Sequence, residues 1–377
     1  MEEKNLELNE ELKYIFKELN IQILPDEPNY WLIRTESGTF FDTFKNENYV
    51  SIGFDKININ DIYNKDEKEL KEKISELYPE CKKPGIILGQ LKKFINEVKK
   101  GDIIIIPSKN SNKLCVGQAF SDSYQVGNDV KNDEIENDIY TYIKRIDVNW
   151  IAEINKNAYD VYIFRLLSSH QGIVSANAYK NFINRMIFPI YYQNGNIHMS
   201  FQINKTDEIS LIETSNFYEI FCNAIDLYNY LTNSNIEYNG ISVKSTVNSP
   251  GIIEFLGETP IMLAVVVLFF LCGGKISGKF TPTEKNIELS TEGFLKKILD
   301  LIKEFHEKNT SDKKMKIEDF KQKSSFVLKS MKANINLNPK KENNIIIINK
   351  RVTKKDNGTE DYENQISMFD DEDDNKH

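Results

Sequence analysis

The segment from Gly89 to Pro107 restricts the fold more than any other, because a helical pattern passes directly into a strand pattern there. The four isoleucines at positions 103–106 favour a strand that is buried on both faces. Gly101 stands where the C-cap of a helix needs a left-handed residue, so we expect a helix over residues 90–100. Apolar residues recur at the spacing of one helical face at Leu91, Phe94, Ile95 and Val98, while lysines cover the other face.

Five short patterns occur in a fixed order around this segment. They are a Trp31-x-x-Arg34 strand, the strand Ser51-Ile-Gly-Phe54, the Gly-Gln90-Leu helix with its Lys-Lys-Gly-Asp ending, a Val116-Gly117 strand and a basic strand that closes on Trp150. Together they resemble the PUA-like modules of the EVE and YTH type, particularly those at the N-termini of bacterial Mrr-like and McrB-like restriction proteins. The resemblance covers residues from about 28 to 170, and it implies a small open β-barrel.

The resemblance also implies a site, because such modules hold a flipped-out base between aromatic rings while cations contact the flanking phosphates. Where the restriction-associated members carry tryptophan, this chain has Phe54, which keeps a stacking face but has no indole N–H. The alternative is that the aromatic residues fill the core of the barrel, where most aromatic side chains lie. The implied residues are the rings of Trp31, Phe54, Phe120, Tyr124 and Trp150, the cations Arg34, Lys144 and Arg145, and the hydrogen-bonding side chains of Ser51 and Gln90.

Length and charge limit the remaining choices. A chain of 377 residues is too long for one such module, so two or three domains are expected. The formal net charge of −9 argues against a nucleic-acid-binding surface over the whole protein, so such binding must be local. The acidic, polar N-terminus has no secretory signal, and a cytoplasmic location is expected. Four scattered cysteines without CxxC spacing fit a reducing compartment and exclude an ordinary zinc knuckle: Cys81, Cys115, Cys222 and Cys272.

The order of patterns predicts an α+β protein in which a small PUA-like open β-barrel is followed by a second mixed α/β domain and a disordered acidic tail. An acidic amphipathic N-terminal helix is expected to pack on another domain or on a second subunit. The expected parts are the helix at residues 1–24, the recognition domain at 25–170, an α+β effector or oligomerisation domain at 171–337 and a tail at 338–377.

The second domain contains two further signals. Gln193-Asn-Gly-Asn196 predicts a tight hairpin turn between two strands. The apolar run from Ile261 to Cys272 is shorter than the roughly 20 residues that a membrane-spanning helix needs. We interpret it as a buried core helix or an oligomer seam, with a membrane-inserted segment as the alternative. Helical periodicity also predicts helices at 217–231, 292–307 and 317–331.

No catalytic centre is recognisable in the sequence. Neither the carboxylate and lysine spacing of a magnesium-dependent nuclease nor a GxxxxGK[ST] phosphate loop is found. The four histidines are not paired within helical reach, and we interpret His170 and His198 as turn and strand residues. The sequence therefore predicts no metal and no cofactor, and it contains no nuclease, NTPase or metal motif that would indicate an enzyme.

The tail carries one short motif, Gln365-Ile-Ser-Met-Phe369, followed by a run of acids. It resembles the peptides that dock on the bacterial replication sliding clamp. Met368 and Phe369 would enter apolar pockets, and Gln365 would form a hydrogen bond at their rim. The alternative for the acidic flank is that it only keeps the tail solvated.

These patterns lead to a first hypothesis, a non-enzymatic sensor or adaptor in a bacterial anti-phage defence or restriction system. Its N-terminal module would bind nucleic acid, DNA in preference to RNA, through a modified or flipped base, and its second domain would form a homo-oligomer or recruit an effector. A different class of function is a membrane-associated effector that inserts residues 261–272 when the N-terminal domain binds a ligand. A third is an unrecognised enzyme within residues 170–330.

Overall fold

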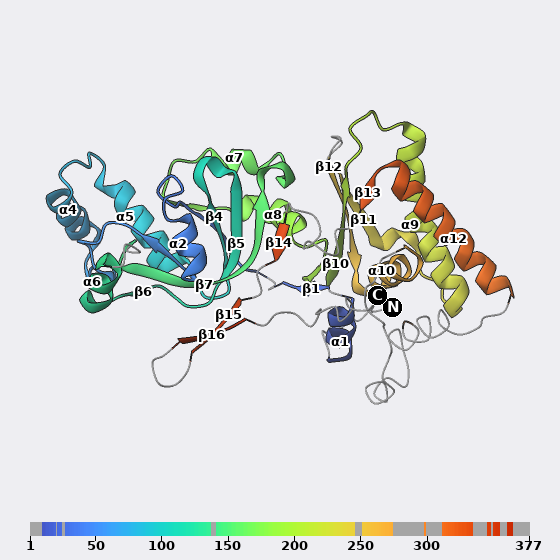
Figure 1. The fold of residues 1–377 in the computed structure, drawn as a ribbon, viewed down its shortest axis with the longest axis horizontal. Coiled ribbons are helices and arrows are strands. Elements are labelled where there is room, and N and C mark those ends of the chain that lie inside the picture. The colour runs from blue at the N-terminus through green and yellow to red at the C-terminus, as the bar shows by residue number, and fades with distance from the viewer. Residues whose placement is uncertain are drawn as a thin grey trace, which may run out of the picture. The chain divides into compact units, whose positions relative to one another are not determined.

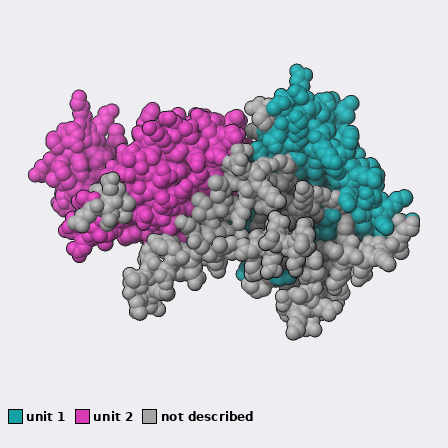
Figure 2. Space-filling view, viewed as in Figure 1, with its two compact units in different colours: residues 1–26, 188–337 teal, residues 27–187, 338–377 magenta. Residues whose placement is uncertain are grey.

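The chain forms two compact units (Figure 2). Unit 1 combines Met1–Asp26 with Phe188–Leu337, and unit 2 combines Glu27–Ile187 with Asn338–His377. The first domain therefore extends further than the predicted boundary at residue 170, and the N-terminal helix belongs with the second domain. The computed structural model describes residues 10–19, 21–24, 27–136, 141–245, 251–273, 298, 311–334, 345–347, 350–354 and 360–364.

A mixed, curled sheet is the frame of unit 2 (Figure 1). Its strand order is β14-β7-β5-β4-β2-β8, and β3 and β6 also pair with β7. The strands β2 and β4 run parallel to each other, whereas the other neighbours are antiparallel. The strands are β2 (Tyr30–Ile33), β3 (Tyr49–Ile52), β4 (Ile103–Pro107), β5 (Lys113–Ala119), β6 (Tyr124–Gln125), β7 (Lys144–Asn155), β8 (Ile173–Ser175) and β14 (Ile345–Ile347), with a separate hairpin of β15 (Lys350–Lys354) and β16 (Glu360–Asn364).

The pairing of β5 with β7 is irregular at one position. Its register shifts between Val116 and Gly117. A Cβ atom on Gly117 would lie 2.5 Å from a methyl carbon of Val148 and 2.7 Å from the carbonyl oxygen of Asn149, so only glycine fits. The extra residue lies on β7, between Trp150 and Ala152, and such a bulge bends the strand that carries it and increases its twist.

Helices and a dense core complete unit 2. The two tryptophans, Trp31 and Trp150, and the helical residues Phe44 and Phe94 are buried in one apolar cluster. The α-helices are α2 (Phe41–Asn46), α3 (Ile59–Asn64), α4 (Glu67–Leu77), α5 (Pro84–Lys92), α6 (Asn128–Glu136), α7 (Ile163–Leu167) and α8 (Lys180–Ile187); the short helical turns are η1 (Lys93–Glu97), η2 (Lys109–Ser111), η3 (Lys156–Ala158) and η4 (Asn177–Tyr179).

The joint at residues 89–107 is partly as predicted. The isoleucine strand is confirmed, since all of β4 is buried. The helix, however, begins at Pro84 and ends at Glu97 in a widened π turn. The predicted cap is wrong: Gly101 has a φ of +99°, but it lies in a turn beyond the helix, where its N–H donates to the carbonyl of Ala119. Gly101 therefore forms the turn that leads into β4 and does not cap the helix.

Glu153 joins two lysines within unit 2. Its carboxylate is buried on β7 and accepts hydrogen bonds from Lys45 Nζ at 2.8 Å and from Lys113 Nζ at 2.7 Å. Burial alone raises the pKa of Glu153, but the two ammonium groups outweigh it and hold the pKa below its usual range. A carboxylate with a depressed pKa stabilises the fold above its unfolded pKa, and this contribution is lost as the pH falls through the folded pKa.

We therefore expect Glu153→Gln to destabilise unit 2 at neutral pH by about 1.5–3 kcal/mol, the range for hydrogen bonds to charged groups. The difference from the wild type should shrink as the pH falls below the usual pKa of glutamate. Urea unfolding followed by tryptophan fluorescence measures this, because both tryptophans lie in unit 2. Glu67→Gln is the control, since Glu67 also pairs with two lysines but is exposed. An equal loss in both variants would contradict the expectation.

Unit 1 is a sheet covered on one face by helices (Figure 1). The strand order is β1-β9-β10-β12-β11, with β13 beside β10. The N-terminal helix contributes Leu12, Ile15, Phe16 and Leu19 to the core of this unit. The elements are α1 (Glu10–Glu18), β1 (Gln22–Ile23), β9 (Ile190–Gln193), β10 (Asn196–Ile203), α9 (Leu211–Thr232), η5 (Tyr238–Gly240), β11 (Ile241–Ser245), β12 (Gly251–Glu258), α10 (Thr259–Gly273), α12 (Ser311–Ser330) and β13 (Ala333–Asn334).

The hairpin prediction in this unit is confirmed. Asn194 and Gly195 both have positive φ, at 50° and 77°, as a two-residue turn between antiparallel strands requires. The predicted helix at 217–231 lies inside the longer α9, and the one at 317–331 corresponds to α12. The predicted helix at 292–307 lies outside the described residues, apart from Ile298.

The apolar run forms α10 and is buried. Its side chains from Met262 to Phe269 belong to the core cluster that also contains α1, β10 and α9. None of the helices in the described part of the chain combines the length and hydropathy that a membrane span requires. The core interpretation of residues 261–272 is therefore the one that the structure favours. The clamp-like motif Gln365–Phe369 lies outside the described residues.

Candidate functional site

The two tryptophans implied as base-binding walls lie inside unit 2. Trp31 Nε1 donates a hydrogen bond to Asp102 Oδ2 at 2.9 Å, and Trp150 Nε1 donates to the carbonyl of Phe44 at 3.0 Å. Both rings are buried, with their one polar hydrogen satisfied inside the protein. For these two residues the structure therefore favours the core alternative over direct contact with a base.

Two implied polar residues are also internal. The guanidinium of Arg145 forms a two-pronged ion pair with Glu134 on α6 and lies 4.1 Å from the ring centre of Tyr49. Burial lowers the pKa of Arg145, but the hydrogen bonds to Glu134 outweigh that effect and raise the pKa overall. Ser51 Oγ donates to Thr141 Oγ1 at 2.9 Å. The Arg145 ion pair thus connects β7 to α6, and the Ser51 hydrogen bond connects β3 to Thr141.

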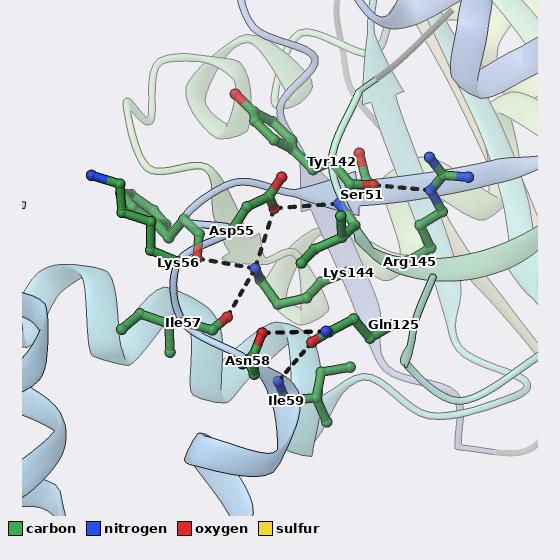
Figure 3. Close-up of polar contacts among 12 residues, drawn as sticks. Ser51, Asp55, Lys56, Ile57, Asn58, Ile59, Gln125, Tyr142, Lys144 and Arg145 are labelled. Carbon is green, nitrogen blue, oxygen red and sulfur yellow. Dashed lines mark hydrogen bonds and ion pairs between the residues drawn. The ribbon is translucent and has the colours of Figure 1, made fainter. Parts of the chain in front are cut away.

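Lys144 is fully buried and holds a loop (Figure 3). Its ammonium donates to the carbonyls of Phe54 at 3.1 Å and Ile57 at 3.2 Å, and it lies 3.4 Å from Asp55 Oδ1. Burial lowers the pKa of Lys144, and the Asp55 carboxylate offsets part of this effect. We call residues 53–58 the Phe54 loop. Lys144 thus fixes its backbone from behind instead of presenting a charge to solvent.

Arg34 and Gln90 hold a second surface segment. The Arg34 guanidinium donates to the carbonyls of Leu167 and Ser169, and burial lowers its pKa. Gln90 Oε1 accepts the backbone N–H of Gly172 at 2.7 Å. Both side chains therefore position the turn at residues 167–172 that leads into β8.

Phe120 and Tyr124 are half-buried and stay close to solvent. Lys100 Nζ lies 5.2 Å from the ring centre of Phe120, and the Tyr124 hydroxyl donates to Asp147 Oδ1 at 2.6 Å. Of the five implied aromatic walls, only these two and Phe54 keep part of their rings exposed.

Phe54 has an unusual backbone. Its φ is +65°, a left-handed conformation that is rare for a bulky residue and costs roughly 1–3 kcal/mol. Its half-buried ring packs against the apolar core of unit 2 and meets Tyr78 edge-on at 5.4 Å. Lys56 Nζ lies 5.4 Å from the Tyr78 ring centre. Strain of this kind persists only where the surroundings enforce it, and here Lys144 does so. Such positions cluster at functional sites.

Tyr142 lies directly over the start of this loop. A Cβ atom on Gly53 would come within 3.2 Å of Tyr142 Cζ, so the ring covers the glycine backbone. The ring also meets Phe40 edge-on at 5.4 Å, and its hydroxyl donates to Glu36 Oε1 at 3.2 Å. Burial and then the charge of Glu36 raise the pKa of Tyr142 to about 12.

A second strained turn faces Tyr142 from the other side. Glu36 and Ser37 have φ values of 47° and 58°, and Gly38 follows at 99°. A Cβ on Gly38 would lie 2.3 Å from the backbone nitrogen of Lys109, so this position requires glycine for space as well as for conformation. The turn holds the Glu36 carboxylate beside the Tyr142 hydroxyl.

We call this surface the Tyr142 site. It offers partly exposed aromatic rings, two carboxylates that accept hydrogen bonds and one ammonium. A flat ring with amino groups fits this chemistry, because it can stack on the aromatic side chains and donate to the carboxylates. Within the described residues, no cluster of three or more His, Cys, Asp or Glu side chains suits a metal ion. The site consists of Glu36, Phe40, Gly53, Phe54, Asp55, Lys56, Tyr78 and Tyr142.

Sequence reasoning singled out only Phe54 from this set. Tyr142 precedes β7 in the sequence, but its partners Glu36 and Gly53 are far away along the chain. A Glu-Ser-Gly sequence is typical of turns, so a left-handed turn near Glu36 could have been suspected. Nothing local indicates that this turn meets Tyr142.

Comparison with known proteins adds one finding. Residues 30–169 match a family described as a domain of unknown function (DUF8426). No curated protein and no solved structure matched the chain. The matched range contains the whole Tyr142 site, and the family description assigns no activity to it.

Proposed function

We propose that unit 2 is a nucleic-acid-binding module of the PUA-like EVE/YTH type and that the Tyr142 site receives a base. The observation that carries this proposal is Phe54, a half-buried aromatic residue held in a strained conformation by the buried Lys144. A ring whose orientation is fixed before binding loses little conformational entropy when a base stacks on it. The resemblance of the surrounding sequence to EVE-type modules supports the same function.

The charges of the site indicate how such binding would work. Stacking of a base on an aromatic ring contributes about 1–3 kcal/mol. Glu36 and Asp55 can accept hydrogen bonds from exocyclic amino groups, which thymine and uracil lack. Lys56 is the cation of the site, and the exposed Lys82 and Lys83 follow Tyr78 in the chain. Affinity should therefore depend more on stacking than on phosphate contacts.

Because stacking should contribute more than phosphate contacts, we expect nucleic-acid binding by the full-length chain that depends only weakly on salt. Fluorescence anisotropy against single-stranded and duplex DNA and RNA, each with and without a modified base, should show binding to at least one member, with DNA preferred. Between about 50 and 200 mM salt, the logarithm of the association constant plotted against the logarithm of the salt concentration should have a slope of about −1 to −3. This slope corresponds to one to three phosphate contacts. Failure to bind every member of the panel would contradict the proposal.

A role as a sensor or adaptor in anti-phage defence or restriction follows from the resemblance, with unit 1 as the oligomerisation or effector part. Docking of the tail on the sliding clamp through Gln365, Met368 and Phe369 stays a prediction, as does the cytoplasmic location. No observation on the described residues favours the alternative of a membrane-associated effector, because the apolar run at 261–272 lies in the core of unit 1.

A further inference from the structure

A second group of polar side chains lies in unit 1, on the sheet face opposite its apolar core. Residues that pair directly across antiparallel strands lie on the same face of the sheet. His198 on β10 pairs with Tyr191 on β9, and Glu254 on β12 pairs with Ser200 and Lys244 on its two sides. The register therefore gathers five polar residues on one face.

Two contacts fix the imidazole of His198. Its Nδ1 lies 2.6 Å from Glu254 Oε1, which also accepts the Tyr191 hydroxyl at 3.0 Å. The Tyr191 ring stacks on the imidazole at 4.3 Å between centroids, with only 11° between the planes. A histidine that donates Nδ1–H to a carboxylate carries its lone pair on Nε2. No hydrogen bond reaches Nε2 from the residues that the structure describes.

The group costs stability and leaves polar atoms unused. Glu254 is fully buried, and its Oε2 has no hydrogen-bond partner among the described residues; the same holds for the buried Oγ of Ser200. Burial raises the pKa of Glu254, but the hydrogen bond from His198 and the charge that this imidazole carries when protonated, together with Lys244, keep the pKa below its usual range. Burial of a carboxylate oxygen without a hydrogen-bond partner is unfavourable for folding. Packing of the sheet alone does not require it.

We propose that unit 1 holds an acid–base catalytic site for ester hydrolysis, in which His198 is the catalytic residue and Glu254 and Tyr191 position it. His198 Nε2 takes a proton from water, and the water oxygen forms a bond to the carbon or phosphorus of the ester. The bond to the leaving oxygen then breaks, and that oxygen takes the proton from Nε2. The Glu254 carboxylate stabilises the intermediate imidazolium, and Lys244 offers a positive charge to the ester oxygen.

This assignment differs from the expectation that the chain lacks a catalytic centre. A lone strand histidine gives no signal in the sequence, because its partner Glu254 lies 56 residues further along the chain. The site is independent of the Tyr142 site, so either proposal can fail without the other.

The first test is the imidazole tautomer of the full-length wild type. With ¹⁵N-labelled histidine, the NMR signals of the neutral His198 ring should show a protonated Nδ1 and an unprotonated Nε2. His198→Gln serves to assign these signals. A protonated Nε2 in the neutral ring would overturn the proposal, since such a nitrogen cannot accept a proton.

The second test is hydrolysis of two probes, p-nitrophenyl acetate for acyl transfer and bis(p-nitrophenyl) phosphate for phosphoryl transfer. His198→Gln should lower kcat/KM on at least one probe by about 10²-fold, the lower end for a general base. Glu254→Gln keeps an acceptor for Nδ1 but loses the charge that stabilises the imidazolium, so kcat should fall while KM stays unchanged. His170→Gln, at an exposed turn, is the matched control and should keep the wild-type rate. Equal rates for wild type and His198→Gln on both probes, including no rate above buffer, would overturn the proposal.

Discussion

Replacing Lys144 with methionine is expected to destabilise unit 2 by about 3 kcal/mol, the lower end for breaking a buried ion pair. The carbonyls of Phe54 and Ile57 and the Asp55 carboxylate would lose their common donor. The lower end is appropriate because Asp55 is 20% exposed and water can replace part of the contact. Methionine keeps the length and most of the volume of the lysine, so the loss reports the ammonium group rather than a cavity.

Urea unfolding followed by tryptophan fluorescence measures this effect in the full-length chain. Lys68→Met, at an exposed position on α4, is the matched control, and it should change the unfolding free energy by less than about 0.5 kcal/mol. If Lys144→Met unfolds at the same urea concentration as Lys68→Met, the buried ammonium does not hold the Phe54 loop as described.

Asp102→Ala is the second substitution with a large expected effect, and it should lower the free energy of unfolding by about 3 kcal/mol. The reason is that three buried or half-buried donors lose their acceptor. The Asp102 carboxylate accepts the backbone N–H groups of Asn29 at 2.9 Å and Lys99 at 3.0 Å, and Trp31 Nε1 at 2.9 Å. It thereby connects the start of β2, the end of the π turn and the entry to β4. Asp102→Asn should lose less, since its amide oxygen still accepts.

The same fluorescence-monitored unfolding distinguishes these two variants, and Trp31 provides a local signal. Its emission should shift in Asp102→Ala under native conditions, because the indole N–H loses its acceptor. An Asp102→Ala variant as stable as the wild type would show that other groups satisfy the three donors.

A comparison of β4 with Asp102 shows which features can be predicted from local sequence and which cannot. A run of isoleucines predicts a buried strand wherever it is placed, and β4 is one. Gly101 follows a helical pattern, which predicts a helix cap, but its N–H donates to the carbonyl of Ala119 instead. The role of Asp102 likewise depends on Asn29 and Trp31, which lie 73 and 71 residues away in the chain. Spacing within one segment carries no information about such partners.

The site residues show the same limit. Resemblance to a module identifies strands that surround a site, and it led to Phe54, but it does not say which way a cation on a curled strand points. Lys144 and Arg145 on β7 are both buried, because the Phe54 loop covers one and α6 pairs with the other. Tyr142 just precedes that strand, and only the folded chain brings it to Gly53 and Glu36.

The domain boundary was also decided by distant contacts. The segment around His170 is rich in turn residues, which is typical of a linker. The chain nevertheless continues in unit 2, since β8 pairs with β2, and Asn177 and Asn184 accept hydrogen bonds from the backbone and hydroxyl of Tyr30. A turn-rich segment can therefore precede a short strand of the same domain, so it does not by itself mark a domain boundary.

The most direct test of base binding at the Tyr142 site compares two phenylalanine variants of the full-length chain. Phe54→Ala removes the strained ring of the site, and Phe326→Ala removes a ring on α12 in unit 1 that is 71% exposed. Their dissociation constants are measured by fluorescence anisotropy with the nucleic acid that the wild type binds most tightly. Loss of one stacking contact of about 1–3 kcal/mol should weaken binding by Phe54→Ala roughly 5- to 150-fold, with Phe326→Ala unchanged. Equal affinities for Phe54→Ala, Phe326→Ala and the wild type would contradict base binding at this site.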